Sequence, residues 1–168
     1  GIFADGDGGT VTVVNSTIAS NSASNDGGGV LSDGGTVALT SVTIADNSAS
    51  LGGGISVEAG TLSLINSIVS RNNASTDSNL SGSFTDDGNN LVDVDAGLGT
   101  LGDFGGPTPT IPLLAGSAAL DAGVLAGLTT DQRGVSRPQG PGVDIGAFES
   151  DLAAPGAASL SIAAGNAQ

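Results

Sequence analysis

The sequence predicts an all-β protein: a right-handed, single-stranded parallel β-helix with three short strands per coil and an irregular C-terminal cap. Three observations predict this fold. The first half of the chain repeats every 25 to 26 residues, apolar and polar residues alternate within each repeat, and the composition is rich in turn-forming residues and poor in aromatic ones. Stacked coils of about 25 residues account for all three observations.

The composition is that of one domain with a core of small aliphatic side chains. The chain has 168 residues, of which 38% are hydrophobic, and this is enough to bury a core. Four phenylalanines and no tryptophan or tyrosine leave valine, isoleucine, leucine and alanine to fill it. The 29 glycines and the many serine, threonine, asparagine and aspartate residues indicate frequent turns and few helices.

Three segments of the chain align with one another. They read "GTVTVVNSTIASNSASNDGGGVLSDG" from Gly9, "GTVALTSVTIADNSASLGGGISVEA" from Gly35 and "GTLSLINSIVSRNNASTDSNLSGS" from Gly60. A unit of this size cannot bury its own inward face. Stacking successive units about 4.8 Å apart pairs each strand with its copies above and below, which predicts a β-helix.

Alternation within each unit predicts three short strands and assigns their inward faces. The first strand carries apolar residues on one face and threonine on the other. The predicted inward residues of this strand are Val11, Val13, Val37, Leu39, Leu62 and Leu64, and the threonines are Thr10, Thr36 and Thr61. The second and third strands are marked by the apolar positions Ile18, Ile44 and Val69, and Val30, Ile55 and Leu80.

Two further features recur at fixed places in the repeat. The asparagines Asn21, Asn47 and Asn72 predict a structural ladder of stacked amides rather than a ligand site. The triple glycines Gly27, Gly28, Gly29 and Gly52, Gly53, Gly54 predict sharp coil corners that need positive φ or close backbone approach. A phosphate-binding loop is the competing interpretation, but no lysine follows the glycines and no helix is expected there.

The charge balance restricts the partners. The formal net charge is −14, with three arginines and no lysine, histidine or cysteine. Nucleic acid and anionic membrane surfaces are therefore poor partners, and a disulfide framework is impossible. No apolar run is long enough to span a membrane. Divalent cations suit such a surface, and Ca²⁺ is the one cofactor that the sequence suggests. The predicted ligands are Asp86, Asp87, Asp93 and Asp95.

The second half of the chain resembles a known family. The motifs are "GNNL" at 88–91, "GGPTPT" at 105–110, "LLAGSAALDAG" at 113–123, "TDQRG" at 130–134, "RPQG" at 137–140 and "VDIGAFE" at 143–149. They resemble the choice-of-anchor Q domain of bacterial surface and secreted proteins. The upstream coils are similar to repeats of polymorphic outer-membrane proteins. Ile111 and Ala118 depart from the family pattern, where a polar residue and a proline are expected.

The resemblance implies a bacterial surface β-helix whose end is closed by this module and which is exported by an anchoring route. The family offers no catalytic residues to transfer. The expected organisation is β-helix coils over residues 1–83, terminal coils and a cap over 84–150, and an alanine- and glycine-rich tail or docking segment over 151–168. The first residues match the glycine and aliphatic pair at Gly29 and Val30, so the chain is expected to begin partway round a coil.

In the cap, charge pairing is the expected use of the arginines, with contact to a substrate as the alternative. The predicted cap ion pairs involve Arg133, Arg137, Asp144 and Glu149.

The sequence favours a non-enzymatic extracellular structural module: a scaffold, an adhesin or a filament subunit. Self-association is expected through the exposed β-helix end and the tail. The alternative is a β-helix that binds or cleaves extracellular polysaccharide with the acidic cluster between Asp86 and Asp95. The lack of histidine, lysine and tyrosine disfavours an enzyme without excluding one.

Overall fold

The computed structural model describes residues 1–6 and 8–156. Within these residues all the regular elements are strands, and they pair in parallel in a single eight-stranded sheet. The strands are β1 (Ile2–Asp5), β2 (Thr10–Ala19), β3 (Val30–Ala45), β4 (Ile55–Ile65), β5 (Ile68–Ser70), β6 (Leu80–Ser81), β7 (Thr85–Asp86) and β8 (Leu91–Val92).

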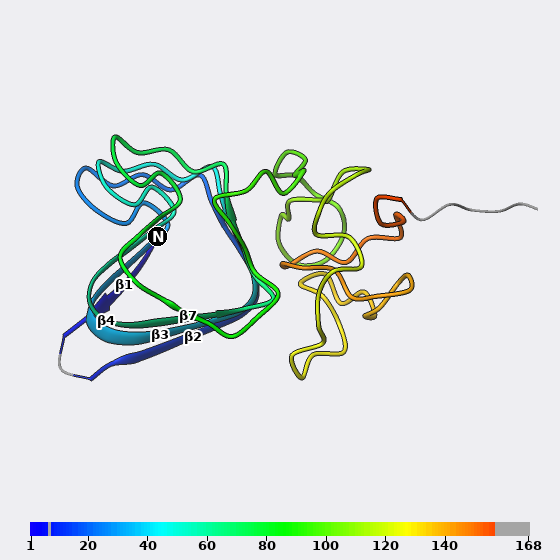
Figure 1. Cartoon of the computed structure of the whole chain (residues 1–168), viewed down its shortest axis with the longest axis horizontal. Helices are drawn as coiled ribbons and strands as arrows, with labels where there is room; N and C mark the ends of the chain where they lie inside the picture. Colours follow the sequence, from blue (N-terminus) through cyan, green and yellow to red (C-terminus); the bar gives the residue numbers. More distant parts are fainter. Residues whose placement is uncertain (7, 157–168) are drawn as a thin grey trace, which may run out of the picture.

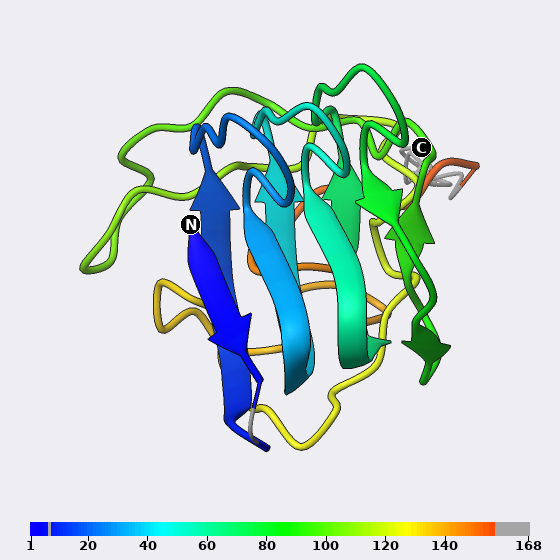
Figure 2. The same ribbon diagram turned by 90° about the vertical axis from the view of Figure 1, so that its left-hand side faces the viewer.

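The sheet is wound into a stack of four coils, which confirms the predicted parallel β-helix. The first coil holds β1 and β2, the second holds β3, the third holds β4 and β5, and the fourth holds β6, β7 and β8. Seen along the stack in Figure 1, the coils overlie one another as a triangle, and Figure 2 shows them side by side. Val11 pairs with Val37, and Val37 pairs with Leu62, so the predicted repeat register is confirmed.

The strands are longer than the three short strands expected per coil. β3 is one strand of 16 residues that bends twice, and its pairing with the neighbouring coils is irregular at both bends. Its bends coincide with positive φ at Gly34 (104°) and Ser41 (52°). The fourth coil is shorter than the others, because Ser63 pairs with Thr85. Parallel pairing resumes on both sides of each bend, so a turn at a positive-φ residue is enough and no longer loop is needed there.

The interior of the coils is an aliphatic core. Val37, Leu39, Ile44 and Leu64 are completely or almost completely buried, as the alternation predicted. Each such side chain contributes about 1.5–3 kcal/mol when it leaves water. Stacking rather than bulky aromatic packing therefore supplies the core.

The C-terminal region (residues 94–156) is irregular, as predicted, but it does not close an end of the β-helix. It lies against one outer side of the coils, to the right of the triangle in Figure 1. A second apolar core forms there around Ala45 and Ile68 of the coils. The residues of the C-terminal region in this second core are Ala96, Leu98, Ile111, Leu113, Ala119, Leu120 and Ile145.

The expected position of the cap across the end of the stack is therefore wrong. The physical reason is that the outward Ala45 and Ile68 leave an apolar strip on the side of the coils that must be covered. Of the expected tail over 151–168, residues 151–156 are mostly exposed, and residues 157–168 lie outside the described part of the chain. No helix among the described residues is long and apolar enough to cross a membrane.

Candidate functional site

The asparagine ladder forms as predicted. The Asn21 side-chain amide donates to Asn47 Oδ1 at 2.9 Å, and the Asn47 amide donates to Asn72 Oδ1 at 2.9 Å. Each of these oxygens also accepts the backbone N–H of the preceding asparagine. The Asn47 amide reaches the carbonyls of Ile18 and Ala45 as well. Because every polar atom of the buried central rung is bonded, the ladder stabilises the corner without offering a ligand site.

The ladder continues to two residues that sequence reasoning missed. Asn72 donates to Asn79 Oδ1 at 3.1 Å, and Asn79 donates to Asp93 Oδ1 at 3.0 Å. Asn79 aligns with Gly54 in the pairing of Ile55 with Leu80, so it is not the repeat equivalent of Asn72. Its side chain fills the ladder position that an asparagine of the fourth coil would fill. The signal in the sequence was the replacement of the third triple glycine by Asp77, Ser78 and Asn79.

The glycine corners have the two predicted causes. Gly27 and Gly52 have φ of 64° and 57°, which side chains rarely adopt. At Gly28, a Cβ would lie 2.4 Å from the Gly53 carbonyl oxygen, and at Gly53 it would lie 2.3 Å from the Asn73 carbonyl oxygen. Glycine is therefore required wherever another coil stacks on the corner. The third copy can carry side chains because no fifth coil stacks on it within the described residues.

A second corner carries another polar column that sequence reasoning missed. Asn15, Ser41, Asn66 and Asn89 follow one another through the four coils, and their φ values lie between 44° and 54°. Asn is one of the few residues that tolerate this conformation. The signal was visible in the repeated "NSTI", "NSIV" and "NNLV".

This second corner binds the C-terminal region. The Asn15 amide donates to the Thr130 carbonyl at 2.8 Å, and the Asn89 amide donates to the Ala122 carbonyl at 2.8 Å. Asn66 donates to the carbonyl of Asp144 and accepts the Val124 N–H.

The adjoining strand adds contacts in the first and second coils. Thr17 donates to Gln132 Oε1 at 2.7 Å, and Thr43 accepts the Ala147 N–H at 3.0 Å. Together with the second corner, these bonds attach the C-terminal region to the first, second, third and fourth coils. It therefore acts as a brace along the stack.

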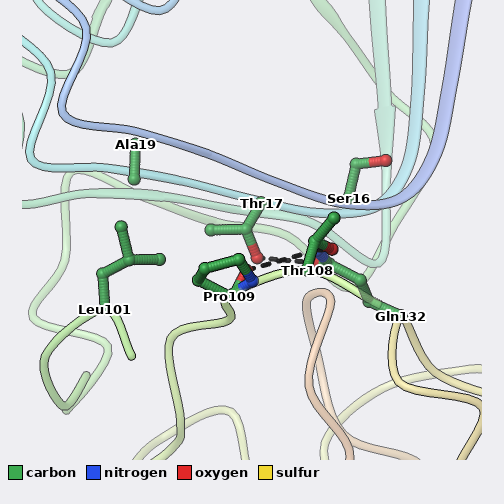
Figure 3. A pocket seen from close by; sticks show the side chains of 7 residues that line it. All are labelled: Ser16, Thr17, Ala19, Leu101, Thr108, Pro109 and Gln132. Carbon is green, nitrogen blue, oxygen red and sulfur yellow. Dashed lines mark hydrogen bonds between the residues drawn. The ribbon is translucent and has the colours of Figure 1, made fainter. Parts of the chain in front are cut away.

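A groove lies where this brace meets the first coil. Figure 3 shows its lining: Ser16, Thr17, Ala19, Leu101, Thr108, Pro109 and Gln132. Its volume is about 370 Å³. Gln132 joins the two sides of the groove, because it accepts from Thr17 and donates to Thr108 Oγ1 at 2.9 Å. The lining holds no titratable side chain, so it has no general acid or base.

The C-terminal region contains a buried ion pair that the sequence predicted. Arg137 Nη1 lies 3.0 Å from Glu149 Oε2, and both side chains are fully buried. The guanidinium also donates to the carbonyls of Asp144 and Gly146. The second Glu149 oxygen accepts the Gln139 N–H. Burial lowers the pKa of Arg137, and the nearby Glu149 opposes this effect.

Of the other two residues predicted to form cap ion pairs, Arg133 does so and Asp144 does not, within the described residues. Arg133 forms its ion pair with Asp131, at 2.7 Å, and binds the backbone carbonyl of Glu149 rather than its carboxylate. Its guanidinium also lies over the ring of Phe148, 3.4 Å from the ring centroid. Asp144 forms no ion pair in the described structure. Its two oxygens accept the backbone N–H groups of Asp121 and Ser150, at 2.8 and 2.6 Å.

The pKa of the Asp144 carboxyl group is raised above its ordinary value. Burial raises its pKa to about 6, although the two backbone N–H donors lower it, and the neighbouring carboxylates of Glu149 and Asp121 raise it further. The Asp144 carboxyl group therefore joins two backbone segments, and the free-energy cost of burying it in its ionised form depends on pH.

The four aspartates predicted to bind Ca²⁺ are not gathered around one centre. Asp86 accepts from the Gly88 N–H and the Asn90 amide, and Asp95 accepts from the Gly97 N–H. Asp93 holds the end of the asparagine ladder. Asp87 is exposed.

The backbone explains this separation. β7 ends at Asp86 and pairs with β4, whereas Asp93 follows β8, which pairs with β5 on another side of the triangle. Within residues 1–6 and 8–156, no group of three or more acidic, histidine or cysteine side chains could hold a metal ion. The carboxylates mainly close turns, which is a common use of aspartate.

Comparison of the chain with protein-family models, with curated proteins and with solved structures finds no match. The resemblance to the choice-of-anchor Q domain is therefore carried by the motif residues alone.

Proposed function

We propose that the chain is a non-enzymatic structural β-helix module that works outside the bacterial cell or on its surface. One observation carries the proposal: the polar side chains that could have served chemistry instead hold turns, ladders and the brace. Asp86 and Asp95 close turns, Asp93 ends the ladder, and Arg137 is buried against Glu149. What remains exposed is an acidic surface with a formal net charge of −14.

The brace supports this role. In an unbraced β-helix the end coil can unfold without the others, because each coil contacts only its neighbours. Here the C-terminal region is hydrogen-bonded to all four coils, so opening one coil also breaks its contacts with the brace. Such reinforcement suits a scaffold or an adhesin stalk.

The surface location rests on the motif resemblance and on composition. A lysine-free chain with a net charge of −14 stays soluble and repels other acidic surfaces. Of the three structural roles, scaffold and adhesin are favoured over a head-to-tail filament. A filament would need the fourth coil of one molecule to stack on the first coil of another, and Asn79 fills the required ladder position at the fourth coil.

The experiment that tests the proposal is a polysaccharide screen. Purified chain is incubated with neutral and acidic polysaccharides, with and without Ca²⁺, and reducing ends, unsaturated uronate absorbance and retention on immobilised glycan are measured. We expect no cleavage and no retention above the level of an unrelated acidic protein. Cleavage that Asp86→Asn or Asp93→Asn abolishes, in a variant that still folds, would contradict the proposal and restore the polysaccharide alternative.

A further inference from the structure

The first coil leaves a strand edge open. Within the described residues, β1 and β2 each pair with β3 on one side only. The core residues next to this edge are correspondingly less covered: Val11 and Val13 are partly buried, whereas their neighbours Val37 and Leu39 are fully buried. The open edge is thus continuous with the interface that joins the first and second coils.

The asparagine ladder is ready to continue at the same edge. In the inner coils, the Oδ1 atom of each ladder asparagine accepts both the backbone N–H and the side-chain amide of the asparagine one coil earlier. At Asn21 this oxygen accepts the amino group of Gly1 at 2.8 Å. The Gly1 nitrogen thus supplies one hydrogen bond where a preceding rung would supply two.

The brace extends past the open edge. In Figure 2 the lime-green segment, around residues 99–110, reaches beyond β2 on the side away from β3. The groove in Figure 3 has β2 residues on one side and this segment on the other. Leu101 faces the groove and is 40% exposed. One coil further in, Ala45 is completely buried against the same region, whereas Ala19 is only partly buried.

The opposite end of the stack lacks these features. Asn79 takes up the final ladder position, and side chains stand at the corner where stacking requires glycine. The fourth coil of a second copy therefore cannot supply the partner of the open edge.

We propose that the open edge of the first coil is a stacking surface for one further parallel β-helix coil, and that the brace forms a prebuilt side wall for it. The coil that fits carries asparagine at the ladder position, glycine at the corner and a small residue facing Leu101, as the second coil of this chain does. The inference rests on the proposed structural role, and it names the kind of partner that the structural module would bind.

The test adds such a coil to the full chain. A copy of residues 29–53 is joined directly before Gly1, which then takes the place of Gly54 in the repeat. We expect the melting temperature to rise by about 5 °C or more. We also expect unpaired β2 amides to exchange at least about tenfold more slowly with solvent. A scrambled copy of the same 25 residues and a copy carrying Asn47→Ala are the controls.

Leu101→Ala tests whether the added coil is stabilising because it packs against the brace or because any added chain raises the melting temperature. In the unextended chain this half-exposed side chain should contribute little to the melting temperature. In the extended chain the same substitution should lower it by several degrees, because the added coil covers Leu101.

Three results would overturn the inference. In one, β2 exchange is unchanged and the added coil is cut by protease. In another, Leu101→Ala has equal effects in both chains. In the third, the unextended chain forms a dimer that protects β2, which makes a second copy the occupant. The polysaccharide screen uses the unextended chain, so its outcome is separate from all three.

Discussion

Arg137 and Glu149 form an ion pair, Nη1 to Oε2 at 3.0 Å, in which both side chains are fully buried. The pair joins the segment before Pro138 to the end of the C-terminal region. The second carboxylate oxygen is held by the Gln139 N–H. Burying both charges costs desolvation free energy, so the pair itself adds little net stability. Removing one partner is nevertheless strongly destabilising, because it leaves the other charge buried and unpaired.

Glu149→Gln should destabilise the protein by about 3–5 kcal/mol, because it leaves the Arg137 guanidinium buried without its counter-charge. Urea unfolding measures the loss. The matched control is Asp46→Asn, which breaks the more exposed pair with Arg71 at 2.6 Å and should cost about 1 kcal/mol or less. Equal losses of unfolding free energy in the two variants would show that breaking the buried pair is no more destabilising than breaking the exposed one.

Asp144 should make the protein less stable as pH rises from about 4 to about 7. Its pKa is raised in the folded state to about 6, so the folded protein holds a proton there that the unfolded chain has already released. The stabilisation is complete below the unfolded pKa of 3.8 and is lost as pH rises through about 6. The rise in pKa corresponds to about 3 kcal/mol at most.

The measurement for Asp144 is the free energy of unfolding as a function of pH in the wild type and in Asp144→Asn. The amide cannot ionise, so this variant should lose the Asp144 contribution and show a shallower slope. Parallel profiles in the two proteins would refute the assignment, and the slope would then belong to the general repulsion of an acidic chain.

Asn47→Ala should destabilise the protein by about 2–4 kcal/mol, because it leaves the buried acceptors Ile18 O and Ala45 O without their donor. Thermal unfolding measures the effect. Asn21→Ala is the matched control at the open edge, where solvent can replace the lost bonds, and it should cost about 1 kcal/mol. A control loss as large as that of the central rung would argue against burial as the cause.

Gly53→Ala should prevent the corner from stacking, because its Cβ would lie 2.3 Å from the Asn73 carbonyl oxygen. A loss above about 3 kcal/mol or failure to fold is expected. Gly6→Ala, where a Cβ meets nothing within 4 Å, should change stability by less than about 0.5 kcal/mol. A well-folded Gly53→Ala protein of unchanged melting temperature would contradict the proposed reason for the triple glycine.

The sequence by itself determined the stack of coils, the inward aliphatic residues, the asparagine ladder and the glycine corners. The physical reason is that a β-helix turns a period in the sequence into a distance in space. Residues 25 or 26 positions apart, such as Asn47 and Asn72, lie beside each other, so their pairing can be read from the alignment of the repeats. The second asparagine corner at Asn66 was accessible by the same logic.

Only the tertiary structure decided where the irregular half of the chain goes. The bond between Thr43 and Ala147 joins residues 104 positions apart that no period relates, and the predicted end cap is a lateral brace for this reason. Asn79 likewise escapes the repeat, because it lies seven residues from its partner Asn72. Asp86 and Asp93 are near in sequence yet lie on different sides of the triangle, since a coil turns between them. Proximity along the chain predicts proximity in space within a strand, but not around a corner.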